Sequence, residues 1–108
     1  MSDFFLKVGD RLPLFRVTLK DGNGDAVDLT GCTVAFSMRE QGSATKKITA
    51  AAATVITAAS GIVEYTWAAL DVDAAGTYLC EWRVTTGAGK VQTIPNDGTD
   101  RVVITVAV

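Results

Sequence analysis

Apolar and polar side chains alternate with a period of two along five stretches of this chain, and this alternation constrains its fold more than any other feature. The stretches are residues 15–20, 32–39, 63–67, 78–85 and 102–108. Successive side chains of a β-strand point to opposite faces, so each stretch predicts a strand with one apolar face. A further short strand is expected at Phe4–Val8. The centres of the stretches predict the core: Val17, Phe36, Tyr65, Tyr78, Trp82 and Ile104.

Turn-forming residues separate the predicted strands. Glycine, asparagine, aspartate or serine gathers at residues 21–25, 41–43, 60–61, 86–89 and 95–98. Strands spaced about 8–12 residues apart with turns between them are typical of an all-β sandwich or barrel. The segment 50–59 combines alanines, which favour helix, with residues 54–57, which favour strand, and we interpret it as a strand or strand pair. Residues 68–75 are expected to form a short helical turn.

Length and composition indicate one domain, residues 1–108. Of the 108 residues 48% are hydrophobic, which is enough to build a single core. Residues 1–9 are either an N-terminal arm or the first strand of that domain. The longest uncharged stretch, Ile48–Val63, is too rich in Ala, Thr, Ser and Gly to cross a membrane. The N-terminus shows no signal peptide, so we expect synthesis in the cytoplasm.

Charge and histidine content argue against several functions. Twelve Asp and Glu outnumber ten Lys and Arg, and no basic stripe is visible, so nucleic acid is not an expected partner. The chain has no histidine, which removes the Ser-His-Asp and Cys-His nucleophiles and the commonest transition-metal ligand. Phosphate-binding glycine loops are absent as well. We therefore predict that the protein is not an enzyme and holds no cofactor or metal.

Residues 73–80 carry the most specific local pattern. They have the form Asp-x-x-Gly-x-Tyr-x-Cys, from Asp73 through Gly76 and Tyr78 to Cys80. This form matches the tyrosine corner of immunoglobulin-like sandwiches. Gly76 would permit a tight turn, Asp73 would cap it, and the Tyr78 hydroxyl would donate a hydrogen bond to upstream backbone. Cys80 falls on the same strand face as Tyr78.

The remaining motifs have plainer interpretations. Cys32 and Cys80 are predicted to be reduced core thiols, with a disulfide between them as the alternative. Residues 21–25 begin like a calcium loop but lack its later Gly and Glu, so we predict a hairpin loop; the alternative is a Ca²⁺ site of Asp21, Asp25 and Asp28. Trp67 and Trp82 are expected in the core rather than on a sugar-stacking surface.

Several stretches together resemble a phage family. They are residues 10–14, 17–21, 24–31, 33–39, 61–65, 75–78 and 94–98, with 102–106. In these stretches the chain is similar to the N-terminal domain of baseplate upper proteins and to related small immunoglobulin-like domains of tailed-phage virions. The resemblance implies a single immunoglobulin-like β-sandwich of seven to nine antiparallel strands. It also implies that residues 27–31 cross between the sheets and that residues 61–65 pair along a sheet edge.

The resemblance further implies a non-enzymatic structural protein of the virion, an adaptor or accessory domain that docks on the tail, baseplate or neck. The alternatives are a capsid decoration protein or a carbohydrate- or cell-surface-binding module. Other virion proteins would be its partners, with several copies or a homo-oligomer in each particle. Apolar residues ahead of the first secure strand and polar loop residues are the interface candidates. These are Phe4, Phe5 and Leu6, the loop of residues 21–25, and Asp97, Asp100 and Arg101 in the loop 95–101.

Overall fold

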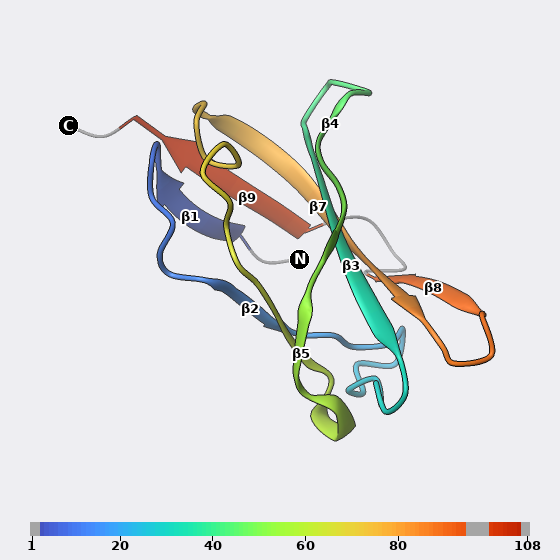
Figure 1. Ribbon diagram of the computed structural model, residues 1–108. Helices are drawn as coiled ribbons and strands as arrows, with labels where there is room; N and C mark the ends of the chain where they lie inside the picture. The colour runs from blue at the N-terminus through green and yellow to red at the C-terminus, as the bar shows by residue number, and fades with distance from the viewer. Residues whose placement is uncertain (1–2, 95–99, 107–108) are drawn as a thin grey trace.

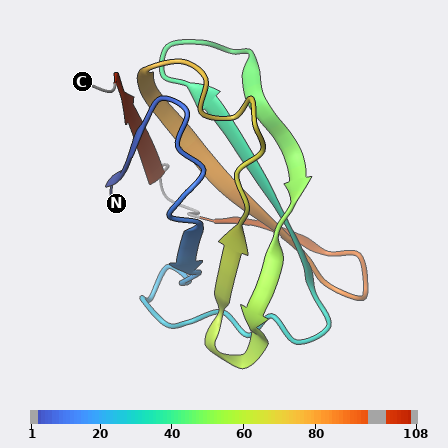
Figure 2. The ribbon, with the colours of Figure 1, turned by 60° about the vertical axis from the view of Figure 1, so that its left-hand side comes forward.

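A computed structural model describes residues 3–94 and 100–106, which form two packed β-sheets (Figure 1, Figure 2). The large sheet has the order β1 (Asp3–Lys7), β9 (Asp100–Thr105), β7 (Gly76–Thr85), β3 (Thr33–Glu40) and β4 (Lys46–Ala52), with β8 (Val91–Ile94) paired to β7. The small sheet has the order β2 (Phe15–Thr18), β6 (Ile62–Tyr65) and β5 (Thr54–Thr57). In the described residues the helical content is one 3₁₀ turn, η1 (Ala58–Ser60). The predicted all-β sandwich is confirmed.

The expectation of antiparallel strands throughout is wrong for one pair. β1 runs parallel to β9, with Asp3 opposite Arg101 and Lys7 opposite Thr105. A tight hairpin forces its two strands to be antiparallel, but β1 and β9 come from opposite ends of the chain and no hairpin joins them. Their relative direction is therefore free to follow the packing of the whole sheet.

The expectation that residues 61–65 line a sheet edge is also wrong. β6 lies between β2 and β5 and pairs with both. Gly61 allows this central position, because a Cβ there would lie 2.8 Å from the Val27 carbonyl oxygen and 2.9 Å from that of Leu19. Its φ of +69° also favours glycine. Glycine at this position thus lets the chain pass close to the backbone of Leu19 and Val27 as it enters β6.

Four connections within the described residues carry the chain between the sheets, and two of them were expected from the sequence. Residues 27–31 lead from β2 to β3, as expected. The strand pair predicted in segment 50–59 is confirmed: β4 belongs to the large sheet and β5 to the small one, and the Ala53 N–H donates to the Val34 carbonyl oxygen at the changeover. The register of β4 shifts against Phe36 and Met38, and Ala50 there has a φ of +46°. Such an irregularity bends the strand that carries it and increases its twist.

Residues 68–75 contain turns and bends instead of the expected helical turn. The Asp71 carboxylate accepts hydrogen bonds from the Tyr65 hydroxyl and from the Ala68 N–H, at 2.6 and 2.7 Å. The Asp71 N–H in turn donates to the Ala68 carbonyl oxygen at 3.1 Å. These bonds close the segment on itself at Asp71, so the chain does not continue into a helix.

The core is built around stacked and tilted aromatic rings from both sheets. The Phe36 ring centroid lies 4.6 Å from that of Tyr65 and 4.7 Å from that of Trp82. Trp67 and Trp82 are both completely buried, as predicted, so neither ring provides a sugar-stacking surface. The predicted core residues are buried with one exception. Val17 is only half-buried, because β2 is an edge strand of the small sheet.

Candidate interaction surface

Residues 3–7 form a strand with two different faces rather than a free arm. Leu6 is buried, and the Phe4 ring packs 4.7 Å from Phe15 and 6.2 Å from Trp67, between centroids. Phe5 points to the other face of the sheet and remains 66% exposed. Among the described strands, β9 is the partner of β1, so the other edge of β1 lies open in the strand order. The site therefore combines an exposed aromatic ring with the edge of a sheet.

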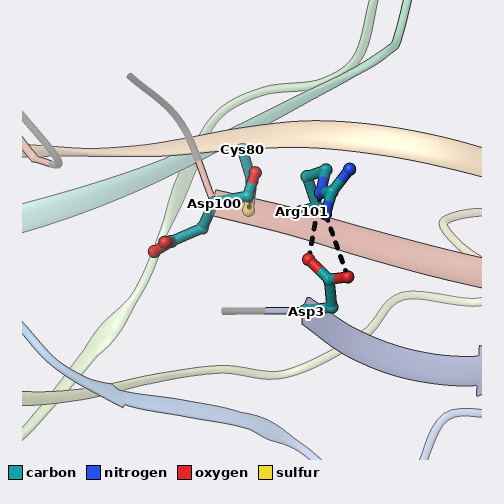
Figure 3. A network of polar contacts seen from close by, with 4 residues as sticks. All are labelled: Asp3, Cys80, Asp100 and Arg101. Carbon is teal, nitrogen blue, oxygen red and sulfur yellow. Dashed lines mark hydrogen bonds and ion pairs between the residues drawn. The ribbon is translucent and has the colours of Figure 1, made fainter. Parts of the chain in front are cut away.

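An ion pair anchors β1 to β9 (Figure 3). The Arg101 guanidinium donates from Nε to Asp3 Oδ1 at 3.0 Å and from Nη2 to Asp3 Oδ2 at 3.1 Å. Two parallel hydrogen bonds fix the relative position of the strands better than a single contact does. The pair thus holds Phe5 in place on the outward face of β1.

Asp100 and Arg101 were expected in a loop, and this placement is wrong. Both belong to β9, where Asp100 lies opposite Cys80 and Arg101 opposite Leu79. The β9 strand starts here because both residues complete the ladder with β7. Asp97, the third candidate of this group, lies outside the described residues.

Cys80 is a structural thiol beneath the start of β9. It is 1% exposed, and its Sγ donates to the Asp100 carbonyl oxygen at 3.4 Å (Figure 3). Burial, and then the nearby charges of Asp100 and Glu81, raise the pKa of this thiol far above its ordinary value. Cys32 is half-buried and, like Cys80, is a free thiol as predicted. Because the thiolate is the reactive form, Cys80 is unsuited to nucleophilic chemistry at neutral pH.

The tyrosine-corner hydrogen bond is present. The Tyr78 hydroxyl donates to the Ala74 carbonyl oxygen at 2.9 Å, and burial raises the pKa of the phenol. Asp73 does not follow its expected role, because its carboxylate forms an ion pair with Lys47 of β4 instead of capping the turn. The hydrogen bond that the Lys47 amine donates to the Asp73 carboxylate raises the pKa of Lys47. Gly76 begins β7 directly after the corner.

The aspartates of the 21–28 segment stabilise the loop backbone. Asp21 Oδ1 accepts from the N–H groups of Asn23 and Asp25, and an isolated bridge between Lys20 and Ala26 closes the hairpin. Asp28 accepts two hydrogen bonds from Thr30, which lower the pKa of its carboxyl. Within residues 3–94 and 100–106, no group of three or more potential metal ligands comes together. The same residues include no helix long and apolar enough to span a membrane.

The sequence of this chain matches the model of one protein family. The model of the BppU N-terminal domain, the N-terminal domain of the phage baseplate upper protein, matches residues 6–95. The chain belongs to the BppU N-terminal domain family. Membership gives it a structural role in the phage tail or baseplate and a place in the virion. The resemblance described from the sequence is confirmed.

A solved structure supports the fold of this BppU-type domain. The N-terminal domain of phage TP901-1 ORF48 superposes with a TM-score of 0.67, over 96% of this chain and 85% of that chain. The two sequences are 14% identical, so this comparison concerns the fold alone. A search of curated proteins gave no match.

Three exposed or half-exposed cations were not among the sequence candidates. Arg39, Lys46 and Arg83 lie near one another on the outward face of the large sheet, around Glu81. The alternation already assigns Arg39 and Arg83 to outward faces. Their proximity depends on the register of β3 against β7 and β4, which the alternation alone does not contain.

Proposed function

We propose that this protein, residues 1–108, is a non-enzymatic immunoglobulin-like adaptor domain that docks on the tail, baseplate or neck of the phage particle in several copies. The exposed Phe5 ring on the edge strand of the large sheet carries the proposal. A phenylalanine that faces solvent from an edge strand, while both its neighbours in the chain face the core, provides apolar area for a partner.

The edge of β1 adds directional contacts to this apolar area. Backbone N–H and C=O groups of an edge strand are able to pair with a strand or loop of another protein. Burial of apolar surface contributes about 25 cal/mol per Å², so a covered phenylalanine ring is a substantial anchor. The Asp3–Arg101 pair pre-organises this edge and so lowers the ordering cost of docking.

The chemistry of the described residues supports a non-enzymatic role. Cys80 is buried and protonated, while Asp21, Asp28 and Asp71 accept hydrogen bonds from their own loops. A nucleophile needs an adjacent base within hydrogen-bond reach, and the chain has no histidine to provide one. We therefore expect the protein to act by binding partners through its surface rather than by catalysing a reaction.

Retention of a Phe5→Asp variant in purified phage particles tests the proposal. Phe5 faces away from the core, so the variant should fold while the particles lose the protein, as judged by a protein gel of purified virions. A double change of Phe4 and Phe5 is less informative, because Phe4 packs against Phe15 and Trp67. Leu70→Asp is the matched control, since Leu70 is 73% exposed and lies in the turn between β6 and β7 rather than on β1.

Two results would contradict the proposal. Normal retention of the folded Phe5→Asp variant would remove the β1 edge as the anchor. Absence of the protein from wild-type particles would remove the adaptor role altogether. The position of the protein in a reconstruction of the whole particle would separate tail, baseplate or neck docking from capsid decoration.

A further inference from the structure

The strand register defines the outward face of the large sheet. Residues paired across neighbouring strands point to the same side, so the outward side chains follow from the partners of Phe5. Phe5 lies opposite Val103, which lies opposite Thr77, and the next outward row contains Asp3, Arg101, Leu79 and Arg39. Further rows add Glu81 with Ser37, and Arg83 with Ala35 and Thr93. Figure 1 shows these strands side by side across the width of the molecule.

Positive charge is concentrated on this face. Its cationic side chains are Lys7, Arg39, Lys46, Arg83 and Arg101, and its anionic side chains are Asp3 and Glu81. Five cations and two anions give the face a net charge of +3, whereas the whole chain carries −2. The rest of the molecule therefore carries −5. The chain is acidic as a whole, but its charge is unevenly distributed: this sheet face is positive and the rest of the molecule is negative.

Two exposed cations of this face, Lys46 and Arg83, lie near one carboxylate. Lys46 and Arg83 are both exposed and, together with Glu81 and Ser37, line a shallow hollow across β3, β4 and β7. Arg39 lines the adjoining hollow and is held by a hydrogen bond from its Nη1 to the Ser43 carbonyl oxygen at 3.0 Å. Arg101 is paired with Asp3, and Lys7 lies apart on β1, whereas Lys46 and Arg83 line the same hollow and are able to meet one partner together.

We propose that the outward face of the large sheet binds an acidic surface of another virion protein, with Lys46 and Arg83 as its principal contacts. This inference rests on the adaptor function proposed above and names the chemistry of its partner. Charge complementarity selects an acidic partner, since a basic one would be repelled by a face of net +3. The face is continuous with the β1 edge through Phe5, Val103 and Leu79, so one partner is able to cover both.

A protein fits this face better than a nucleic acid does. The outward rows interleave the cations with apolar Phe5, Leu79 and Val103, a mixture typical of a protein interface. Nucleic-acid sites instead gather cations along a stripe that follows the phosphate backbone.

Charge reversal at the two cations, Lys46→Glu with Arg83→Glu, tests this inference in phage particles. The double variant should reduce the amount of protein per purified virion at least about tenfold, because like charges then face each other across the interface. Lys20→Glu with Lys90→Glu is the matched control. It changes the net charge by the same amount at exposed positions outside the face and should leave the amount per virion unchanged. Circular dichroism and thermal unfolding verify that both variants fold.

Crosslinking identifies what the face touches. A zero-length carbodiimide reagent applied to wild-type virions should join the Lys46 amine to an Asp or Glu of another virion protein, as found by mass spectrometry of the digested product. Retention of the folded double variant at the wild-type level overturns the inference. So does binding of the isolated protein to double-stranded DNA that the reversal abolishes, in the absence of any protein crosslink.

The outcomes for the two proposals are distinguishable. If Phe5→Asp particles lose the protein while the charge-reversed variant is retained, the adaptor function stands and only the acidic-partner inference fails. If wild-type virions lack the protein, both fail together.

Discussion

Tyr78 links a local sequence pattern to the stability of the sandwich. Its ring is 3% exposed in the core, and its hydroxyl reaches back to the Ala74 carbonyl oxygen across the turn that precedes β7. Tyr65 has a related role in the small sheet, where its hydroxyl donates to Asp71 at 2.6 Å. Each phenol thus fastens the end of a strand to the loop beside it.

Replacing Tyr78 by Phe should lower the free energy of unfolding by about 1 kcal/mol, because one buried hydrogen bond is lost while the ring stays. Tyr65→Phe should cost more, about 1.5–3 kcal/mol, because the lost hydroxyl donates to the Asp71 carboxylate and hydrogen bonds to charged groups are stronger. Urea denaturation midpoints of the two variants and the wild type measure both effects. An unchanged midpoint for Tyr78→Phe would mean that the corner bond contributes nothing in solution.

The β1 strand has a structural face and a free face. Phe4 and Leu6 close one end of the core, whereas Phe5 lies on the solvent side. Because β1 is held mainly by these inward side chains, by the ladder with β9 and by the Asp3–Arg101 pair, its two faces can be changed separately. Substitutions of Phe4 or Leu6 should therefore change the stability of the domain, whereas substitutions of Phe5 should change its docking.

Phe4→Ala should destabilise the domain by about 2–3 kcal/mol, somewhat less than the about 3–5 kcal/mol typical of a fully buried phenylalanine. Phe5→Ala should change the stability by no more than about 0.5 kcal/mol, as is usual for an exposed site. Chemical denaturation of both variants provides the comparison. Equal losses would show that β1 does not pack on the core with Phe4 inward.

Several groups across the molecule bind their protons more tightly in the folded protein than in the unfolded chain. Burial raises the pKa of Cys80, Tyr65 and Tyr78 above ordinary values of 9.0, 10.0 and 10.0. The hydrogen bond to Asp73 likewise raises the pKa of Lys47 above 10.5. A group with a raised folded pKa contributes stability that is complete below its unfolded pKa and is lost as the pH rises beyond it.

Stability should therefore be constant from about pH 7 to about pH 8.5 and fall steadily above about pH 9, as the unfolded chain releases protons that the folded one retains. Urea midpoints measured across this range test the prediction. Cys80→Ala removes the group with the lowest ordinary value, so its midpoint should decline less steeply between about pH 9 and about pH 10. A wild-type midpoint that stays level up to about pH 10.5 would contradict the prediction.

The sequence by itself determined most of the strands, though not β8 or the start of β9, and which of their side chains face the core. Phe36, Trp82 and Ile104 were predictable because the alternation of side chains is a local property of any strand, whatever its partner. The Tyr78 corner was predictable for the same reason, since its bond spans four residues. Val17 is the exception, because the burial of an inward residue also depends on whether its strand lies at an edge.

Only the tertiary structure decided how the strands meet. The parallel pairing of β1 with β9, the central place of β6 and the gathering of Arg39, Lys46 and Arg83 all depend on contacts between distant segments. Alternation orients a side chain but sets neither the direction nor the register of its neighbouring strand. The separation of exposed Phe5 from inward Phe4 and Leu6, and the basic sheet face, therefore followed only from the assembled sheets.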